Sequence, residues 1–328
     1  MQTVSWGIIG CGDVTEVKSG PAFNKIDGSQ LSAVMRRNGA KAEDYARRHD
    51  VPKWYNNADK LIHDPDVNAI YVATPPDTHA EYAIRAMKAG KPVYCEKPMA
   101  LNYQQCLDML RVSEETGQPL FVAYYRRRLP QFMKVRELLE KKVIGDIRFV
   151  NIQLYHPPRE HDFDMERRSW HVIPEIGGGG YFADMSPHQW DILDYWFGPI
   201  KSISSMVKNK AGKYPAEDYV SVLFEFESGI SGAGQWCFTV DASSKKDIIE
   251  IVGSRGSIIL SCFDYQPVIV TTASGTKHFP YELPVHIQQP FIAGIVDELL
   301  GKEKSASDAR AAARTNLIMD DVLKAIDT

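Results

Sequence analysis

The stretch VSWGIIGCGDVT, Val4 to Thr15, decides the fold. It begins as an apolar run typical of a strand that is buried on both faces, and it continues into a helix-like segment that ends near Phe23. The same alternation of apolar strands and helical segments continues as far as LFVAYY, Leu120 to Tyr125. This alternation is typical of a parallel sheet with helices on both faces. Residues 1–124 are therefore predicted to form a doubly wound α/β domain of the Rossmann type.

Two glycines follow the first predicted strand and open the first predicted helix. Gly10 permits a tight turn, and Gly12 lets the backbone approach a pyrophosphate at the start of the helix. Thr15 stands where the third glycine of this pattern is usually found. Two close glycines after a strand also occur in simple tight turns, but at the start of an alternating domain they favour dinucleotide binding. The residues expected to contact the dinucleotide here are Gly10, Cys11, Gly12, Asp13 and Val14.

The end of the second predicted strand indicates which dinucleotide is preferred. NAD-binding chains commonly place an acidic residue there to accept hydrogen bonds from the ribose, whereas an arginine accommodates a 2′-phosphate. This chain has Arg36 and Arg37 and no acid at that point. A guanidinium can bind the phosphate through two hydrogen bonds, so NADP(H) is favoured over NAD(H). The alternative is that both arginines are solvated surface residues at the start of a helix.

Composition limits the class of protein. The chain has 328 residues, of which 44% are hydrophobic and 24% are charged, with a formal net charge of -4. This length suits two domains, and the absence of a basic excess makes nucleic acid an unexpected partner. The five cysteines form no CxxC pair, and no 18 apolar residues follow one another. The sequence predicts a cytoplasmic protein without a membrane or nucleic-acid partner.

The pattern changes after residue 124. A helical segment is followed by several alternating strands that meet through short Gly or Ser turns, which is typical of a mainly antiparallel sheet. Two helices, near Ile287 to Leu300 and Ala309 to Ile326, are expected at the end of the chain. Residues 125–328 are therefore predicted to form an α+β domain for substrate binding and oligomerisation.

A glycine run in the second predicted domain precedes a pair of acid/base residues. In GGGGYFADMSPHQWDILDYWFG, Gly177 to Gly198, the part after the glycines is predicted to be one helix. Asp184, His188 and Asp191 would then share one face of it. A carboxylate one turn from an imidazole can orient the ring and leave its other nitrogen free to exchange a proton. Such pairs also occur on ordinary helices without any catalytic role.

Together, these motifs resemble the Gfo/Idh/MocA oxidoreductases along essentially the whole chain. The resemblance includes the early glycine loop, a TPxxxH turn at Thr74, Pro75 and His79, the EKP motif at Glu96 to Pro98, and the later glycine run with Asp184 and His188. It implies that the lysine of EKP, Lys97, reaches the substrate hydroxyl near the nicotinamide, and that the peptide before the proline is often cis. It also implies a proton-transfer role for Asp184 and His188. Cofactor contacts are expected from Thr74, Pro75, His79, Glu96 and Lys97.

The position of EKP supports this interpretation independently of the resemblance. Glu96 and Lys97 follow the short apolar strand VYC, and the carboxyl ends of parallel strands border the cofactor crevice. Both charges are therefore expected to project into the site rather than into the core. An ammonium there can polarise a carbonyl oxygen or stabilise a developing alkoxide. An isolated EKP would instead be read as a surface ion pair.

Further residues near the predicted site are candidates for substrate contact. Trp170 and His171 stand where many members of the family have Trp-Arg, so His171 either replaces that arginine or only packs. Tyr125 lies in the run YYRRRLP, Tyr124 to Pro130, at the predicted domain junction. The arginines of that run can bind anions, although two of the three are expected to be solvated. The candidate substrate contacts are Tyr125, Trp170, His171 and His188.

A metal site is not expected. His156, His161 and Asp162 lie close together in the sequence, but their spacing fits no compact ligand motif. The predicted hydride chemistry also needs no metal.

The sequence predicts an NADP(H)-dependent oxidoreductase that interconverts a secondary alcohol and a carbonyl on a sugar-like, polyhydroxylated small molecule. The substrate class follows from the resemblance, whose members include 1,5-anhydrofructose reductases, inositol and xylose dehydrogenases and dihydrodiol dehydrogenases. Lys97 and His188 would polarise or protonate the reacting oxygen, and Asp184 would orient the imidazole ring. One alternative is a redox-neutral glycosidase with tightly held NAD, and another is a non-catalytic cofactor-sensing regulator.

The second domain is also expected to form a homo-oligomer, either a dimer or a tetramer. In the strand DIIEIVGS, Ile248 and Val252 lie on one face, and Ile249 and Ile251 lie on the other. Neither face of such a sheet suits water, so helices of the chain can cover one face and a partner subunit the other.

Overall fold

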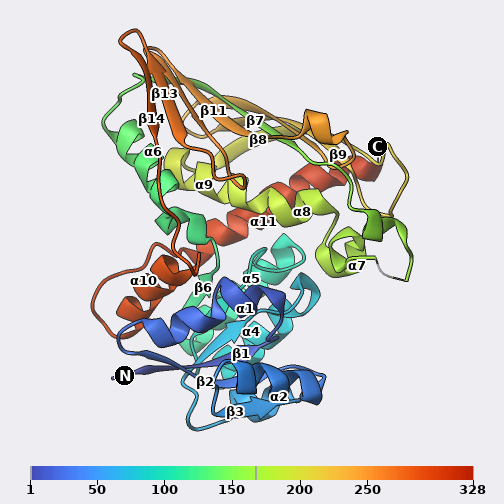
Figure 1. Cartoon of the computed structure of the whole chain (residues 1–328), viewed down its shortest axis with the longest axis vertical. Coiled ribbons are helices and arrows are strands. Elements are labelled where there is room, and N and C mark those ends of the chain that lie inside the picture. The colour runs from blue at the N-terminus through green and yellow to red at the C-terminus, as the bar shows by residue number, and fades with distance from the viewer. Residues whose placement is uncertain (1, 167, 328) are drawn as a thin grey trace. The chain divides into compact units, whose positions relative to one another are not determined.

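The computed structural model describes residues 2–166 and 168–327, and the side chains of these residues except 326 and 327. The chain divides into two compact units. The first contains residues 1–128 and 283–313, and the second contains residues 129–282 and 314–328. The sequence interpretation placed everything after residue 124 in the second domain, whereas the structure groups residues 283–313 with the first unit (Figure 1).

The first unit contains a six-stranded parallel sheet in the order β3-β2-β1-β4-β5-β6. This order, with the switch beside β1, is that of a Rossmann fold and confirms the predicted fold class. Its strands are β1 (Val4–Ile9), β2 (Ser29–Met35), β3 (Lys53–Tyr55), β4 (Ala69–Val72), β5 (Val93–Cys95) and β6 (Leu120–Val122).

Helices and single 3-10 turns connect these strands. Asparagine side chains accept hydrogen bonds from the first backbone amides of α2, α3 and α5, which is the preferred way to begin a helix. The α-helices are α1 (Asp13–Val17), α2 (Gly39–Arg48), α3 (Ala58–Ile62), α4 (His79–Lys88), α5 (Tyr103–Thr116) and α10 (Gln289–Leu299), and the 3-10 turns are η1 (Gly20–Lys25), η2 (Pro76–Thr78) and η3 (Tyr125–Arg128).

The first helix is shorter than the sequence predicted. The segment expected to be helical as far as Phe23 divides into α1 and the 3-10 turn η1. Pro21 lies in the first turn of η1, and a proline inside a continuous α-helix would remove a hydrogen bond and clash with the preceding turn. The division therefore has a local cause in the sequence.

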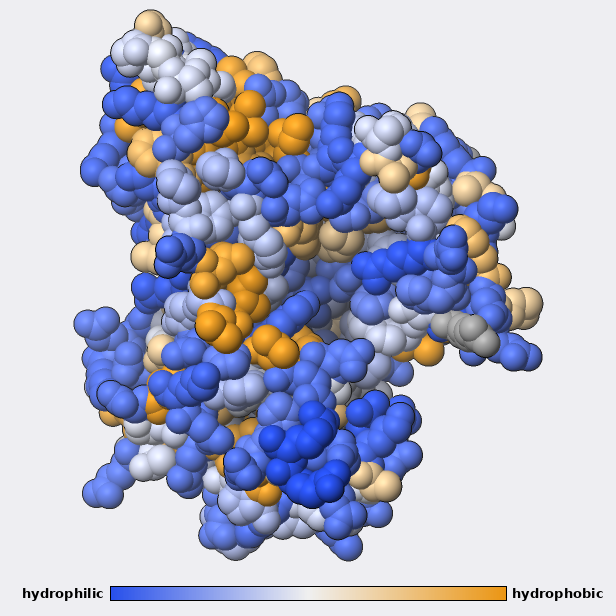
Figure 2. Space-filling model, in the orientation of Figure 1, coloured by the Kyte–Doolittle hydropathy of each residue, from blue (hydrophilic) through white to orange (hydrophobic). Residues whose placement is uncertain are grey.

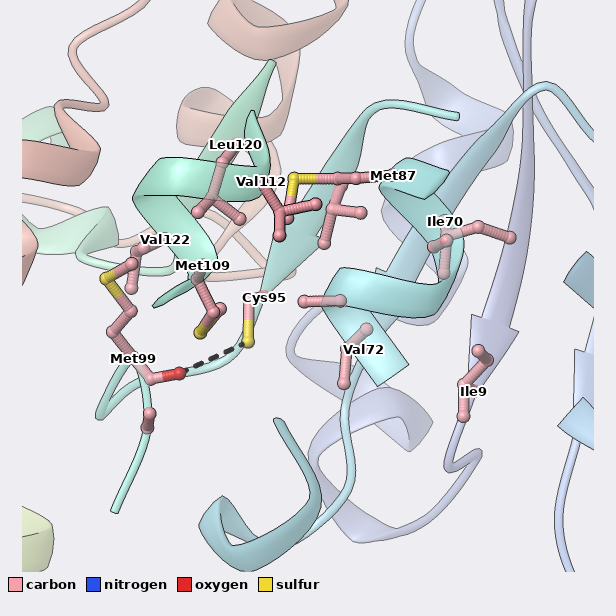
Figure 3. Packing of buried hydrophobic residues seen from close by; sticks show 14 of the residues in the cluster. Ile9, Ile70, Val72, Met87, Cys95, Met99, Met109, Val112, Leu120 and Val122 are labelled. Atoms are coloured by element: carbon pink, nitrogen blue, oxygen red, sulfur yellow. Dashed lines mark hydrogen bonds between the residues drawn. The ribbon is translucent and has the colours of Figure 1, made fainter. Parts of the chain in front are cut away.

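A core of aliphatic and sulfur-containing side chains lies between the first sheet and helices α4 and α5. Figure 3 shows Cys95, at the end of β5, among these side chains, with its thiol directed at the backbone carbonyl of Met99 at 3.7 Å. Ala312 and Ala313 from the start of α11 belong to the same cluster. The end of β5 is thus held in a packed environment directly before Glu96 and Lys97.

The second unit contains an eight-stranded sheet in the order β14-β13-β12-β11-β7-β10-β9-β8. All neighbouring strands are antiparallel except β10 and β7, so the predicted mainly antiparallel sheet is confirmed. The strands are β7 (Ile147–Tyr155), β8 (Ile200–Lys208), β9 (Tyr219–Phe226), β10 (Ser231–Cys237), β11 (Lys246–Gly253), β12 (Gly256–Leu260), β13 (Val268–Thr272) and β14 (Gly275–Phe279).

Helices pack along one face of this second sheet (Figure 1). Trp190 on α9 packs edge-on against Phe224 and lies 5.3 Å from Trp236, centroid to centroid. The α-helices of the unit are α6 (Pro130–Glu140), α7 (Pro174–Gly177), α8 (Tyr181–Met185), α9 (Pro187–Phe197) and the part of α11 (Ala309–Leu323) from residue 314 onward. Its 3-10 turns are η4 (Glu160–Phe163), η5 (Trp170–Val172), η6 (Ala242–Ser244) and η7 (Lys324–Asp327).

The opposite face of the second sheet carries half-exposed side chains. Ile249 and Ile251 are fully buried on the helix side, whereas Ile248 and Val252 are only half-buried on the other side, as the sequence predicted. Leu223 is 65% exposed and Met206 is 54% exposed on that other side. Figure 2 shows a mostly hydrophilic surface in which hydrophobic residues gather near the strands labelled β11 and β13.

Among the helices that the structure describes, none is long and apolar enough to span a bilayer.

Candidate functional site

The glycine loop after β1 has the geometry of a phosphate cradle. Gly10 has a φ of +94°, and a Cβ added there would lie 2.7 Å from the Thr74 side chain. A Cβ at Gly12 would meet only the carbonyl oxygen of Gly10, at 3.8 Å, so the space above Gly12 is open. Gly10 is thus required by the turn and by the close approach of the segment after β4, whereas Gly12 leaves room for a ligand. The residues present fit a dinucleotide pyrophosphate.

Thr15 replaces the third glycine without disturbing this loop. It is fully buried, its hydroxyl donates to the carbonyl of Gly12, and its own carbonyl accepts from the Tyr45 hydroxyl at 2.8 Å. The Thr15 side chain therefore stabilises the turn through a hydrogen bond within it. Beside it, burial raises the pKa of the Cys11 thiol to about 11, which favours the neutral thiol at neutral pH. Asp13 is exposed and Val14 is half-buried at the start of α1.

The two arginines after β2 differ in their surroundings. Arg36 is half-buried, and its Nη1 donates to the carbonyl of Cys11 at 3.4 Å, which places its guanidinium beside the glycine loop. Arg37 is exposed, and Asn38 then caps α2 by accepting from the amide of Lys41. The sequence reasoning treated these arginines as a pair, but the contact to the cofactor loop comes from Arg36.

The TPxxxH turn after β4 is joined to the EKP loop by His79. This side chain is only 1% exposed, and its ring nitrogens lie 2.9 Å from the carbonyl of Pro98 and 2.7 Å from the carbonyl of Thr74. Burial lowers the pKa of His79, and the two carbonyls oppose that shift. Both ring nitrogens therefore face the protein backbone, so the geometry gives His79 the role of holding two loops rather than contacting a cofactor. Thr74 and Pro75 are half-buried at the mouth of the turn.

Glu96 lies inside the unit rather than in the crevice, contrary to the expectation from the sequence. Its side chain is almost fully buried, and Oε1 accepts from the Tyr71 hydroxyl at 2.6 Å and from Nε2 of Gln288 at 2.7 Å. Its Oε2 accepts from the backbone amide of Lys97 at 3.2 Å. A buried carboxylate needs such donors, and they come from β4 and from the distant start of α10. Lys97 itself is half-buried, and the Lys97–Pro98 peptide bond is cis, as the resemblance implies.

Gln288 is a residue that sequence reasoning missed. It is fully buried, donates to Glu96 and accepts from the Tyr94 hydroxyl at 2.6 Å. Its backbone amide donates to the carbonyl of Lys18 at 3.1 Å, which ties the start of α10 to the segment after α1. No local sequence motif indicates that Gln288 bonds to Glu96 and Tyr94, because these partners lie more than 190 residues earlier in the chain. The only signal is the helical pattern that begins near Ile287.

The glycine run of the second unit leads into two short helices instead of one. α8 ends at Met185 and α9 begins at Pro187, with Ser186 between them. Proline is favoured in the first turn of a helix and disfavoured inside one, which explains the break. Asp184 therefore lies on α8, whereas His188 and Asp191 lie on α9, so the prediction of one continuous helix is wrong.

The carboxylate of Asp184 lies near an imidazole that the sequence did not indicate. Its Oδ2 lies 3.7 Å from Nε2 of His171, and Nδ1 of His171 lies 2.6 Å from the Ser169 hydroxyl. The ring of His171 stacks on Trp170 and, at 5.9 Å between centroids, on Tyr181. His171 is thus held by ring contacts, by the Ser169 hydroxyl and beside the Asp184 carboxylate.

His188 is only 4% exposed, and its ring meets the edge of Phe263 with 6.1 Å between centroids. Phe263 lies in a turn after β12 whose amides, from Cys262 to Asp264, donate to the buried carboxylate of Asp247. This turn places an aromatic wall beside the imidazole. His188 and the Asp184–His171 pair all belong to the second unit.

The arginines at the predicted domain junction are more buried than expected. Arg126 and Arg127 are 3% and 4% exposed, so the expectation that two of the three arginines are solvated is wrong. Arg127 donates to the carbonyl of Ala306, and the guanidinium of Arg126 lies 5.2 Å from the centre of the Tyr125 ring. The carbonyl and the ring give these cations partners inside the first unit. Tyr125 is itself buried there.

Within the parts of the chain that the structure describes, no three His, Cys, Asp or Glu side chains gather as a metal site. Asp162 instead accepts from the Tyr181 hydroxyl at 2.6 Å. This contact fixes the segment before the glycine run.

Comparison with known proteins identifies the family. Residues 4–124 match the family model described as an oxidoreductase family with an NAD-binding Rossmann fold, and residues 132–259 match the model of the GFO/IDH/MocA C-terminal domain. A protein of Formosa agariphila named "Oxidoreductase P35" is 41% identical over 318 residues, which cover 97% of each chain. The chain belongs to the Gfo/Idh/MocA oxidoreductase family. The resemblance seen in the sequence motifs is thereby confirmed.

Two further proteins are similar to this chain. The trans-1,2-dihydrobenzene-1,2-diol dehydrogenase of Mus musculus is 28% identical over 284 residues, covering 84% of this chain and 79% of that protein. The solved structure of a levoglucosan dehydrogenase in complex with NADH and levoglucosan has a TM-score of 0.88 and 20% identity, and the match covers 99% of this chain and 97% of that one. The second comparison establishes a shared fold.

Proposed function

We propose that this protein is a dehydrogenase or reductase that uses a nicotinamide dinucleotide, with NADP(H) favoured, to interconvert a secondary alcohol and a carbonyl on a sugar-like, polyhydroxylated molecule. The observation that carries the proposal is the placement of Lys97. It follows β5 at the carboxyl edge of the parallel sheet, the same edge at which the glycine loop follows β1. Ligands of doubly wound sheets bind at that edge.

The surroundings of Lys97 support a catalytic role. Its backbone amide donates to Glu96, and the carbonyl of Pro98 is held by His79, so the backbone on both sides of Lys97 is fixed. A fixed ammonium beside the nicotinamide position can stabilise negative charge on the reacting oxygen without rearranging during the reaction. The bound dinucleotide would accept or supply the hydride.

The proton is assigned to the second unit. We infer that His188 exchanges a proton with the substrate oxygen, and that Asp184 and His171 bind or orient the substrate beside it. Imidazole is suited to this exchange because its unperturbed pKa lies near neutrality. The proposal requires Lys97 and His188 to reach the same substrate molecule. Tyr125 and Trp170 remain proposed substrate contacts on the strength of the family resemblance.

The NADP(H) preference rests on Arg36. Its guanidinium donates a hydrogen bond to the Cys11 carbonyl and therefore lies beside the glycine loop. Arg36 follows the end of β2, where the ribose of the dinucleotide is expected. Arg37 is exposed at the same strand end and is available for the 2′-phosphate. The levoglucosan dehydrogenase structure contains NADH, so the preference must be measured for this chain.

The sugar-like substrate class is inferred from relatives. The names of the compared proteins specify a dihydrodiol and levoglucosan, and both compounds carry hydroxyl groups on a six-membered ring. A panel of sugars, sugar alcohols, ketosugars, levoglucosan and cyclic diols should be incubated with NADP⁺, NADPH, NAD⁺ and NADH. Reduced cofactor is followed by its absorbance, and product is quantified by chromatography.

The stoichiometry of this experiment tests the reaction class. One cofactor oxidised or reduced per product supports the dehydrogenase. Product without net change in the cofactor would assign the protein to redox-neutral chemistry, such as glycoside cleavage with transient oxidation. Dinucleotide binding without turnover of any member of the panel would favour a cofactor-sensing regulator.

A further inference from the structure

Glu217 is a buried carboxylate that the proposed mechanism does not use. It lies just before β9 in the second unit and is 4% exposed. Its Oε1 accepts a hydrogen bond from the backbone amide of Gly180 at 2.7 Å. Gly180 is the last residue of the glycine run and precedes α8, the helix that carries Asp184. A residue far along the chain thus contacts the start of the segment that holds a proposed site residue.

The glycines of the run make room for Glu217. A Cβ at Gly180 would lie 2.5 Å from the Glu217 carbonyl oxygen and 3.1 Å from Oε1. A Cβ at Gly179, which has a φ of +154°, would lie 3.2 Å from the same Oε1. Contacts below 3.4 Å force a neighbour to move, so any larger residue at Gly180 would displace Glu217. At Gly180 the Glu217 backbone carbonyl and carboxylate leave no room for a side chain, and at Gly179 the Ala183 Cβ at 2.8 Å, the carboxylate and the positive φ together favour glycine.

This carboxylate supplies the cap that α8 lacks in its own sequence. The N-cap residue of α8 is Gly180, which has no side chain to accept from the first-turn amides. Helices normally obtain that acceptor from Ser, Thr, Asp or Asn at the N-cap. Here Glu217 accepts from Gly180, and the Ala183 backbone amide also faces its carboxylate. Asp184 immediately follows Ala183.

We propose that Glu217 is a positioning residue that fixes α8, and with it the Asp184 carboxylate, by capping the helix from outside its own sequence. This inference rests on the proposed function only in assigning Asp184 to the reaction. The cap itself is a matter of hydrogen bonding that can be tested without a substrate.

The charges around Glu217 give the cap a defined pH dependence. Asp218 is a charged neighbour of Glu217, and its carboxylate accepts from the amides of Lys210 and Ala211. Glu217, Asp218, Tyr181 and Asp162 all interact electrostatically with Tyr214. Burial, assisted by Asp218, raises the pKa of Glu217 from 4.5 to about 7. Because the closed cap binds the proton more tightly than an opened, solvated one, the stabilising contribution is complete below pH 4.5 and is lost as the pH rises through 7.

Amide hydrogen exchange of residues 180–185, corrected for intrinsic rates, tests the cap on the full chain. In the wild type, the opening constant should increase roughly fiftyfold or more between pH 5 and pH 8. In Glu217→Gln, which keeps an oxygen acceptor but cannot ionise, it should change little over that range. In Glu217→Leu, the same amides should exchange at least about tenfold faster than in the wild type at pH 6, because the acceptor is gone. Asp64→Asn, a change to a buried carboxylate of the first unit, should leave residues 180–185 unaffected.

Turnover of the best substrate from the panel separates the cap from its catalytic consequence. Glu217→Leu should lower kcat more than KM changes, and Glu217→Gln should restore most of it. Unchanged exchange in Glu217→Leu, or the same pH slope in Glu217→Gln and the wild type, overturns the proposal even if the leucine variant folds poorly. Faster exchange with normal kcat also overturns the positioning role. In that case Asp184→Asn identifies the failure: normal turnover in this variant would show that the site assignment, not the cap, is at fault.

Discussion

Replacement of Gln288 by methionine should destabilise the loop that presents Lys97. Methionine has a similar length but offers neither the Nε2 donor to Glu96 nor the Oε1 acceptor for Tyr94. The backbone amide of residue 288, which donates to Lys18, is unaffected by the change. The variant therefore removes the polar contacts and keeps most of the packing.

The expected loss of local stability follows from the two groups that lose a hydrogen-bond partner, Tyr94 and Glu96. The Tyr94 hydroxyl is fully buried, and leaving it unsatisfied costs about 1–3 kcal/mol. The hydrogen bond to the Glu96 carboxylate is charge-assisted and is worth about 1.5–3 kcal/mol. Glu96 keeps its bond from Tyr71, and neighbouring effects are not additive, so a local loss of roughly 3–5 kcal/mol is expected. This corresponds to an opening constant that rises by roughly two to four powers of ten.

Native-state hydrogen exchange is the suitable assay because it reports opening of individual segments. Peptides that cover β5 with the EKP loop, and the first turn of α10, should lose protection together. Gln266→Met, at an exposed glutamine of the second unit, is the matched control and should change protection by less than about threefold. If the β5 and α10 peptides of Gln288→Met exchange within about threefold of the wild type, the buried polar network does not hold Lys97 in place.

Three further predictions concern the proposed site and assembly. Lys97→Met should retain dinucleotide binding, measured by fluorescence titration, but lower turnover by roughly two to four powers of ten, and His188→Ala should do likewise; near-normal turnover in either would contradict the mechanism. Replacement of both Arg36 and Arg37 by alanine should weaken NADPH binding far more than NADH binding, and a wild type that binds NADH at least as tightly as NADPH would rule out the assigned preference. Leu223→Arg on the half-exposed sheet face should shift a dimer or tetramer towards monomer in sedimentation while Trp54→Arg does not, and a monomeric wild type at micromolar concentration would disprove oligomerisation through this face.

The elements that sequence patterns predicted well are those with strong apolar periodicity. β1, β2 and β4 are mostly apolar runs between turn signals, and their alternation with helices predicted the parallel sheet of the first unit. The sequence reasoning did not find β8 or β14. Both strands are largely exposed and rich in polar residues, so their sequences lack the regular apolar alternation of a half-buried strand.

The direction of individual side chains was harder to predict. EKP correctly indicated the end of a strand, but the sequence could not show that Glu96 turns inward, because its donors on Tyr71 and Gln288 are distant in the chain. The buried positions of Arg126 and His79 have the same cause. Both side chains find partners, a ring and two backbone carbonyls, that only the folded chain supplies.

The proposed site therefore depends on polar groups that do not themselves meet the substrate. In the first unit, His79 and Glu96 hold the backbone on either side of Lys97, and Glu96 in turn depends on Gln288. In the second unit, the proposed role of Glu217 is to cap α8, the short helix that carries Asp184. Without such support, a lysine on a loop or an aspartate on a short helix would sample many positions, and a catalytic group loses most of its effect when it is misplaced by about 1 Å. Substitutions at these supporting residues should consequently affect kcat through geometry, whereas Lys97 and His188 should affect it through charge and proton transfer.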